Sequence, residues 1–94
     1  MLYVIYCRDR ADGAPIRQAN RPAHLAWAKD QPEIRMAGPM LADDGETMIG
    51  SLFVREAPDL ETVRRIHGED PYVRAGLFER MEIHPFRWLL PAGS

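Results

Sequence analysis

The chain begins with a continuous apolar run that has to be covered on both sides. Residues 2 to 8 are rich in Val, Ile and Tyr, which favours a β-strand, and the run is too short for a helix. Side chains of a strand alternate between its two faces, so Val4 points to one side and Tyr3 and Ile5 to the other. Because both sets are apolar, we expect this strand to lie inside a sheet that is packed on both faces.

A helical segment follows, and it contains a proline. Residues 14 to 30 read as helix, but Pro22 has no backbone N–H and its ring clashes with the preceding turn. We therefore predict a main helix over residues 21–30, with Asn20 or Arg21 as its N-cap and Pro22 in its first turn, where proline is tolerated. A looser turn is predicted over residues 14–20.

Turn residues divide the rest of the chain into short elements. Pro39 cannot join a central ladder on both sides, which predicts an edge or bulged strand. Asp59 is a suitable N-cap for a second helix, and Gly68 ends it. The predicted elements after the first helix are strands over 34–41 and 47–55 that form a hairpin, a helix beginning within 58–61, an extra turn over 70–76 with Gly76 as C-cap, and a strand over 79–90.

The order β-α-β-β-α-β predicts an α+β fold of the ferredoxin-like kind, with an antiparallel four-stranded sheet and both helices on one face. Two helices cover only that face, yet the first strand is apolar on both. We therefore expect the open face to pair with a second copy of the chain, as a homodimer.

Length and charge restrict the classes of function. Ninety-four residues predict one domain over 1–94, with an ordered core to about residue 90 and a frayed tail over 91–94. The net charge of −2 argues against a nucleic-acid partner. The N-terminal run is too short to cross a membrane and lacks the basic start of a signal peptide, so we expect a cytoplasmic protein and no membrane partner. Cys7 is the only cysteine, which leaves a buried apolar role as its expected one.

Histidines are the residues most able to carry chemistry here. His24, His67 and His84 have no metal-ligand spacing, and the chain has no Gly-rich phosphate loop, so we expect neither a metal nor a cofactor. His24 stands early in the first helix, in line with Arg17 and Arg21 at helical spacing. By spacing alone, the favoured interpretation of His24 is a surface histidine or one with satisfied hydrogen bonds.

An ordered set of short motifs nevertheless resembles the YCII-related family over nearly the whole chain. No single motif is specific, but their order is. The motifs are RPAHL at 21–25, AGPM at 37–40, GS at 50–51, EDPYVRAG at 69–76 and PF at 85–86. The resemblance implies a ferredoxin-like domain that pairs into a dimeric α+β barrel. It also implies an active site in which a histidine and an aspartate meet, which here are His24 and Asp70.

The implied chemistry comes from relatives of that family. A related enzyme removes chloride from a chlorinated hydroxyquinol, and muconolactone isomerase-like proteins share the superfamily. We therefore expect a cofactor-independent lyase or isomerase for a small cyclic oxygenated compound, with His24 as general acid/base and Asp70 as its orienting partner. Ser51 and backbone N–H groups near Gly38 are expected to hold a substrate oxygen, and Arg17 or Arg21 to attract an anionic substrate.

Two other functions remain open from the sequence. One is a non-catalytic dimeric module that binds a small molecule or a protein, in which Asp70 is only a helix N-cap and the dyad is a structural hydrogen bond. The other is a cofactor-free oxygenase of the same superfamily.

Overall fold

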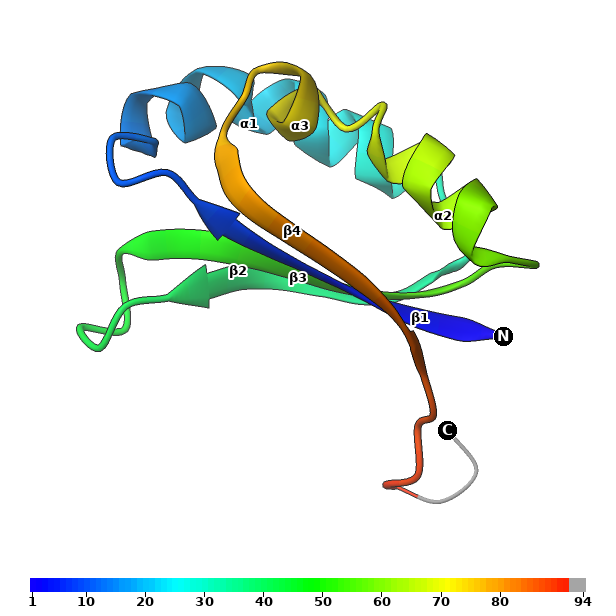
Figure 1. Cartoon of the computed structure of the whole chain (residues 1–94). Coiled ribbons are helices and arrows are strands. Elements are labelled where there is room, and N and C mark those ends of the chain that lie inside the picture. Colours follow the sequence, from blue (N-terminus) through cyan, green and yellow to red (C-terminus); the bar gives the residue numbers. More distant parts are fainter. Residues whose placement is uncertain (92–94) are drawn as a thin grey trace.

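The computed structural model describes residues 1–91 as one antiparallel sheet with the helices on one of its faces (Figure 1). The strand order is β2-β3-β1-β4, so the first and third strands are central. This is the predicted ferredoxin-like βαββαβ plan, which is confirmed. The elements are β1 (Leu2–Asp9), α1 (Ala14–Lys29), β2 (Ile34–Leu41), β3 (Met48–Glu56), α2 (Leu60–His67), α3 (Pro71–Arg74) and β4 (Phe78–Phe86).

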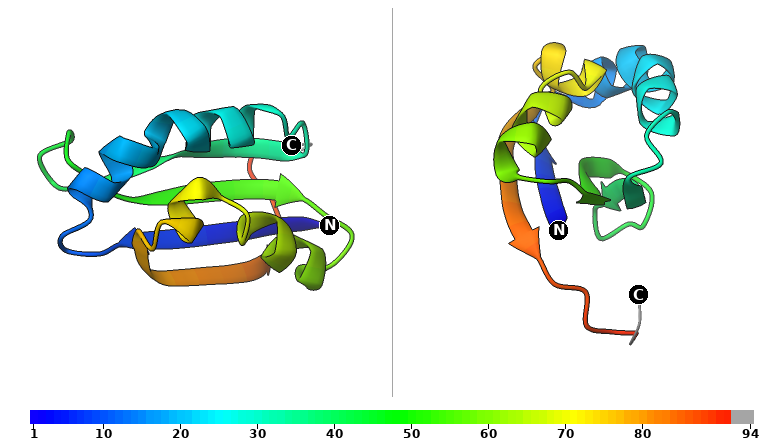
Figure 2. Two further views of the ribbon diagram at one scale, coloured as in Figure 1. Left: turned by 90° about the horizontal axis from the view of Figure 1, so that it is seen from above. Right: turned by 90° about the vertical axis from the view of Figure 1, so that its right-hand side faces the viewer.

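The helices cover one face of the sheet (Figure 2). The hydrophobic core lies between them and this face. Ile5 of β1 stands opposite Phe53 of β3 in the register, and both are essentially inaccessible to solvent. Val63 of α2 closes the core from above. Side chains alternate along the central strands, so these residues share the helix side of the sheet. The apolar pattern of the first strand predicts this alternation.

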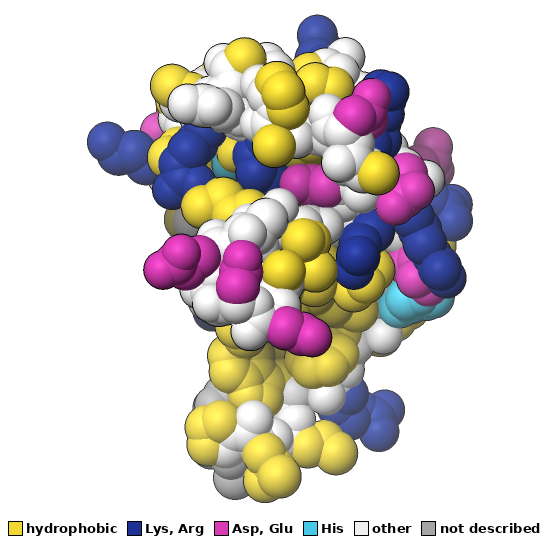
Figure 3. All heavy atoms as spheres, turned by 90° about the vertical axis from the view of Figure 1, so that its left-hand side faces the viewer, with side chains coloured by type: hydrophobic (Ala, Val, Ile, Leu, Met, Phe, Trp, Pro, Cys, Tyr) yellow, Lys and Arg dark blue, Asp and Glu magenta, His cyan; other side chains and the backbone are white. Residues whose placement is uncertain are grey.

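The opposite face of the sheet is also apolar. Val4 stands opposite Val54, and Tyr6 stands opposite Leu52, and no helix within residues 1–91 covers them. At one edge Phe86 is 41% exposed. Hydrophobic side chains occupy the lower part of the surface, below the helices and towards the C-terminal end (Figure 3). An exposed apolar area of this kind is typical of an interaction surface.

The first helix differs from its prediction. Instead of a main helix over 21–30, α1 is continuous from Ala14 to Lys29, and its N-cap is Gly13 rather than Asn20 or Arg21. Pro15, not Pro22, occupies the first turn, where its missing N–H removes no helical hydrogen bond. Pro22 lies inside the helix on its exposed side, because packing of the opposite side against the sheet outweighs the loss of one backbone bond.

The hairpin of β2 and β3 has the predicted position. The strand β2 covers the predicted residues 34–41 and lies at the edge of the sheet, which is where Pro39 is tolerated. The strand β3 begins and ends one residue later than the predicted 47–55. Pro39 stands opposite Ser51, so both side chains point to the helix side of the sheet.

The last strand is shorter than the predicted 79–90. It ends at Phe86, which pairs with Leu2 at the beginning of β1. Leu2 is the first residue of β1, so the ladder between the two strands ends with this pair. The chain then leaves the sheet (Figure 1).

Side-chain caps fix the two short helices. Asp59 accepts a hydrogen bond from the Thr62 N–H at 2.7 Å, and Gly68 ends α2, as predicted. The extra turn α3 ends with Ala75 as its C-cap, one residue before the predicted Gly76. Gly76 follows with φ of 73°, a left-handed conformation that glycine adopts without strain.

The described part of the chain contains no helix that is long and apolar enough to cross a lipid bilayer. Residues 92–94, which belong to the predicted frayed tail, lie outside the described residues.

Candidate active site

A cavity of about 170 Å³ opens between α1 and the β2–β3 edge of the sheet. The helix α1 supplies one wall, the two strands supply the floor and α3 closes one end. Five of the six residues that the sequence analysis singles out line this cavity. The lining residues are Arg17, Arg21, His24, Leu25, Ala28, Ala37, Gly38, Pro39, Ser51, Phe53 and Tyr72.

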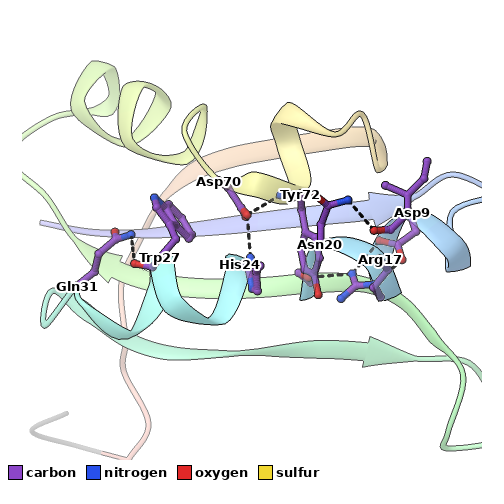
Figure 4. A network of polar contacts seen from close by, with 10 residues as sticks. Asp9, Arg17, Asn20, His24, Trp27, Gln31, Asp70 and Tyr72 are labelled. Carbon is purple, nitrogen blue, oxygen red and sulfur yellow. Dashed lines mark hydrogen bonds and ion pairs between the residues drawn. The ribbon is translucent and has the colours of Figure 1, made fainter. Parts of the chain in front are cut away.

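The sixth residue, Asp70, lies next to His24, and a dashed line joins the two side chains in Figure 4. Its Oδ1 is 2.8 Å from Nδ1 of His24, although the two residues are 46 positions apart. Asp70 is also the N-cap of α3, because the same Oδ1 accepts the Tyr72 backbone N–H at 2.9 Å. Pro71 at the first helical position needs no N–H partner. The Asp-Pro-Tyr sequence therefore builds a short helix whose cap holds the carboxylate against the histidine.

The second ring nitrogen of His24 remains open to the cavity. His24 is 8% exposed, and its Nε2 has no hydrogen-bond partner within residues 1–91. No buried side-chain nitrogen or oxygen in that part of the chain lacks a partner, so Nε2 is in contact with the open space. An ionised carboxylate can only accept hydrogen bonds. With Asp70 ionised, Nδ1 carries the proton and neutral His24 offers a lone pair on Nε2.

The predicted role of Arg17 as an attractor of anions does not fit its surroundings. Arg17 is buried and donates from Nε and Nη2 to the two carboxylate oxygens of Asp9, at 2.8 and 2.9 Å. Nη2 also donates to Oγ of Ser51 at 3.0 Å. A charge inside a protein needs a partner, and Asp9 is that partner. Asp9 ends β1, and no sequence pattern indicated it as the partner of Arg17.

Tyr72 is the contributor to the site that sequence reasoning missed most clearly. Its ring stacks on the His24 imidazole with 4.0 Å between centroids and 13° between planes. The Arg17 guanidinium carbon lies 4.7 Å from the centre of the same Tyr72 ring. Burial raises the pKa of the Tyr72 phenol, although the Arg17 and Arg21 charges oppose the shift. Tyr72 therefore stays neutral at physiological pH, and its position after Asp-Pro is the only signal that the sequence offers.

The other two predicted residues border the cavity in different ways. Arg21 is exposed, and its Nη1 donates to the Met48 sulfur at 3.4 Å. Gly38 stands opposite Leu52 in the hairpin register, which places its missing side chain on the open face of the sheet. Gly38 therefore borders the cavity through its backbone.

Cys7 lies beneath the site on β1, opposite Ser51. Burial raises the pKa of its thiol to about 12, and nearby Asp70 and Asp9 add to the shift. The thiolate is the reactive form of cysteine, so Cys7 is inert at neutral pH and fills the predicted apolar position. Residues 1–91 contain no group of three or more His, Cys, Asp or Glu side chains that could hold a metal ion.

A second buried histidine lies next to the site but faces another way. His67 ends α2, and it is 1% exposed. Its ring packs edge-on against Phe53 and Trp27, with centroids at 4.9 and 5.4 Å. Nη1 of Arg55 approaches His67 Nε2 at 3.5 Å. Since Arg55 can only donate, His67 accepts there and is neutral.

We expect His67 to make the fold sensitive to mild acid. Burial, together with the Arg55 charge, lowers the pKa of His67 from 6.5 to about 4. The contribution of His67 to the free energy of unfolding is complete above pH 6.5, where the side chain is neutral in both the folded and the unfolded chain. It is lost as the pH falls towards 4, because the unfolded chain binds the proton first. The loss amounts to at most about 3 kcal/mol.

Urea denaturation of the wild type and of His67→Gln at several pH values between 7 and 5 checks this expectation. The window lies above the range in which the carboxylates with lowered pKa values, Asp44, Glu56 and Asp59, lose their contributions. The wild type should lose stability across the window, and the variant should lose less. Equal slopes for the two proteins would contradict the assignment.

Sheet order and helix placement define a ferredoxin-like α+β domain, with a small cavity between its first helix and the edge of the sheet. The cofactor-independent oxygenase SnoaB from Streptomyces nogalater has the same fold, with a TM-score of 0.56 over 96% of this chain and 95% of that one. Its sequence identity is 16%, so this likeness concerns the fold alone. The model of the YCII-related domain matches residues 1–87, and the chain belongs to that family.

Curated and solved relatives agree with this assignment. Protein YciI of Escherichia coli O6:H1 is 39% identical over 93% of this chain and 97% of its own length. An uncharacterized protein of Haemophilus influenzae is 34% identical over the same shares. The 5-chloro-2-hydroxyhydroquinone dehydrochlorinase of Burkholderia phenoliruptrix, solved in complex with 2,5-dihydroxybenzoquinone, is 32% identical. Its TM-score is 0.85, over 93% of this chain and 94% of that one.

Proposed function

We propose that this protein is a cofactor-independent lyase or isomerase that acts on a small oxygenated ring. In this proposal His24 is the general acid/base and Asp70 is its orienting partner. The observation that carries the proposal is the 2.8 Å contact between His24 Nδ1 and Asp70 Oδ1, which leaves Nε2 facing the cavity. The similarity to a dehydrochlorinase over nearly the whole chain supports the same class of reaction.

The dyad is suited to moving a proton in both directions. Neutral His24 takes a proton from a ring hydroxyl at Nε2, and the imidazolium that forms is stabilised by the Asp70 carboxylate. Asp70 also fixes the ring orientation, because its other hydrogen bond, from the Tyr72 N–H, anchors the carboxylate to α3. The stacked Tyr72 ring holds the imidazole plane from the side.

The proposed lyase reaction balances without an oxidant. A hydroxyl of a hydroquinone loses its proton to His24, and its electron pair moves into the ring. The ring carbon that carries the leaving group receives the proton back from the imidazolium. Loss of the proton of a second hydroxyl then expels the leaving group with its bonding pair. The products are a quinone, one proton and one anion, and an isomerase would use only the first two steps.

The dimensions of the cavity restrict the substrate. A volume of about 170 Å³ lies below the range of about 300–1,000 Å³ that is usual for drug-sized ligands. Leu25, Ala28 and Phe53 line it with apolar surface, which suits the faces of a ring. We infer that one six-membered ring with small substituents occupies it.

Ser51 and the backbone at Gly38 are the proposed contacts for ring oxygens. Oγ of Ser51 already accepts a hydrogen bond from Arg17, so its own proton is free to be donated into the cavity. In this proposal the buried pair of Arg17 and Asp9 positions Ser51 rather than attracting the substrate. Donors that are fixed before the reaction stabilise a developing oxyanion without reorganisation.

Turnover of a panel of single-ring compounds tests the proposed function. The panel contains 5-chloro-2-hydroxyhydroquinone, other chlorinated hydroquinones and hydroxylated lactones, and the assay follows released chloride and the absorbance of the ring. We expect turnover by the wild type without added cofactor and in the presence of EDTA. Binding of ring compounds without turnover of any would favour the non-catalytic module instead.

We also propose that the open face of the sheet joins two copies of the chain. Val4 and Leu52 lie near its centre, on the two central strands. Light scattering should give twice the mass of the 10.7 kDa chain at micromolar concentration. Leu52→Glu should give monomers, because it places charges into the apolar contact. Ala19→Glu, on the exposed side of α1, is the control and should stay dimeric, whereas a monomeric wild type would refute the proposal.

A further inference from the structure

Two cavities border the arginines of α1, and the proposed chemistry uses only one of them. The inner cavity holds the open nitrogen of His24. An outer cavity of about 360 Å³ lies between α1 and the β2–β3 turn, with Glu46 and Met48 on its turn side. Arg17 and Arg21 line both cavities and therefore lie at the junction between them.

The two arginines at this junction differ in their charge balance. Arg17 is neutralised by the two carboxylate oxygens of Asp9. Arg21 has no carboxylate within 4.0 Å among residues 1–91, and Glu46 across the outer cavity does not reach it. Arg21 donates a hydrogen bond to the Met48 sulfur, which is a weak acceptor. Arg21 is thus the uncompensated positive charge at the mouth of the inner cavity.

The spacing along α1 relates this charge to the reacting nitrogen. Arg21 and His24 are three residues apart, so their side chains leave the helix on the same face with about 5–6 Å between Cβ atoms. A ring in contact with Nε2 of His24 thereby extends towards the guanidinium. The planar fork of an arginine matches a carboxylate with two parallel hydrogen bonds, which a single hydroxyl cannot accept.

We propose that the substrate is an aromatic or quinonoid acid whose carboxylate is bound by Arg21 at the junction, with the ring in the inner cavity. The outer cavity then holds any substituent of the substrate that is attached to the carbon bearing the carboxylate. This inference deepens the proposed function and rests on the inner cavity being the substrate site. It assigns to Arg21 alone the anion recognition that the sequence left open between Arg17 and Arg21.

Calorimetric titration with a matched pair of probes tests the inference without any turnover. The probes are 2,5-dihydroxybenzoate and 2,5-dihydroxybenzamide, which share their ring hydroxyls and differ in the charge of one substituent. The wild type should bind the acid about tenfold more tightly than the amide, as one charge-assisted pair implies. The preference should shrink as the salt concentration rises.

Two variants locate the preference. In Arg21→Gln the ratio of the two dissociation constants should fall to near one, while the affinity for the amide stays unchanged. Arg64→Gln removes the same charge from an exposed position on α2 that lines neither cavity, and it should keep the wild-type ratio. A wild type without preference for the acid, or a preference that persists in Arg21→Gln, overturns the inference.

These outcomes are separable from the fate of the proposed reaction. The acid preference is read from binding alone, so it holds even if His24 proves dispensable for turnover. Conversely, turnover that depends on His24 together with equal binding of acid and amide would retain the proposed function and reject the role of Arg21.

Discussion

His24→Gln should lower the turnover of a ring substrate by about 10²- to 10⁴-fold, the range that general acid–base catalysis usually contributes. Glutamine keeps a polar side chain of similar reach at this position, but it cannot take up a proton near neutral pH. The affinity for a ring ligand should change little, because Leu25, Ala28 and Phe53 still line the cavity. Steady-state kinetics and calorimetric titration of the same protein measure the two quantities.

Asp70→Asn should cause a smaller loss than His24→Gln. The amide oxygen can still accept the Tyr72 N–H and cap α3, so the local fold is kept. What disappears is the negative charge that stabilises the imidazolium during proton transfer. Asp59→Asn is the matched control, because Asp59 caps α2 in the same way and is exposed, away from the cavity.

Full turnover in His24→Gln would make the dyad a structural hydrogen bond. The geometry allows that outcome to be recognised, since Asp70 is an N-cap whether or not His24 is present. A structural role predicts that His24→Gln lowers the free energy of unfolding and leaves any turnover unchanged. A catalytic role predicts that His24→Gln lowers turnover and leaves the free energy of unfolding unchanged.

Local signals were sufficient for the order of elements and for most caps. The apolar alternation of Ile5 and its neighbours, the Pro39 edge and the Asp59 cap depend on a few adjacent residues, and the structure has them where the sequence predicts them. The position of Pro22 does not depend on neighbours alone. A helix that gains enough from packing on a sheet can keep an exposed interior proline, and that gain cannot be read from the helix sequence.

The site was predictable only in part, for a related reason. The pairing of His24 with Asp70 came from the family resemblance, because nothing in a spacing of 46 positions brings two side chains together. The pair of Asp9 and Arg17 and the stacking of Tyr72 on His24 were missed. Each contact joins α1 to another element, β1 for Asp9 and α3 for Tyr72, so both depend on the tertiary arrangement rather than on a motif.

Asp9→Asn should lower the free energy of unfolding by about 3–5 kcal/mol, because it leaves the Arg17 charge buried without a counter-charge. Arg17 and Asp9 are 6% and 7% exposed, so water cannot replace the lost carboxylate. A loss of this size is a large part of the about 5–15 kcal/mol that stabilises a typical domain. Urea denaturation at pH 7 measures it.

The exposed pair of Arg10 and Asp12, in the loop that connects β1 to α1, provides the control. Its side chains are 46% and 72% exposed and 3.2 Å apart, so Asp12→Asn should cost no more than about 1 kcal/mol. Equal effects of the two substitutions would show that burial does not govern the Asp9 pair.

The double variant Asp9→Leu with Arg17→Met separates stability from function. Apolar residues of similar size often replace a buried ion pair without loss, so this variant should regain most of the stability that Asp9→Asn loses. It should nevertheless bind ring ligands more weakly, because Ser51 loses the Arg17 donor that orients its hydroxyl towards the cavity. A double variant that is both stable and fully active would mean that the pair serves neither purpose. A double variant that is stable but binds ring ligands weakly would explain why a charged pair occupies a position that hydrophobic residues can fill.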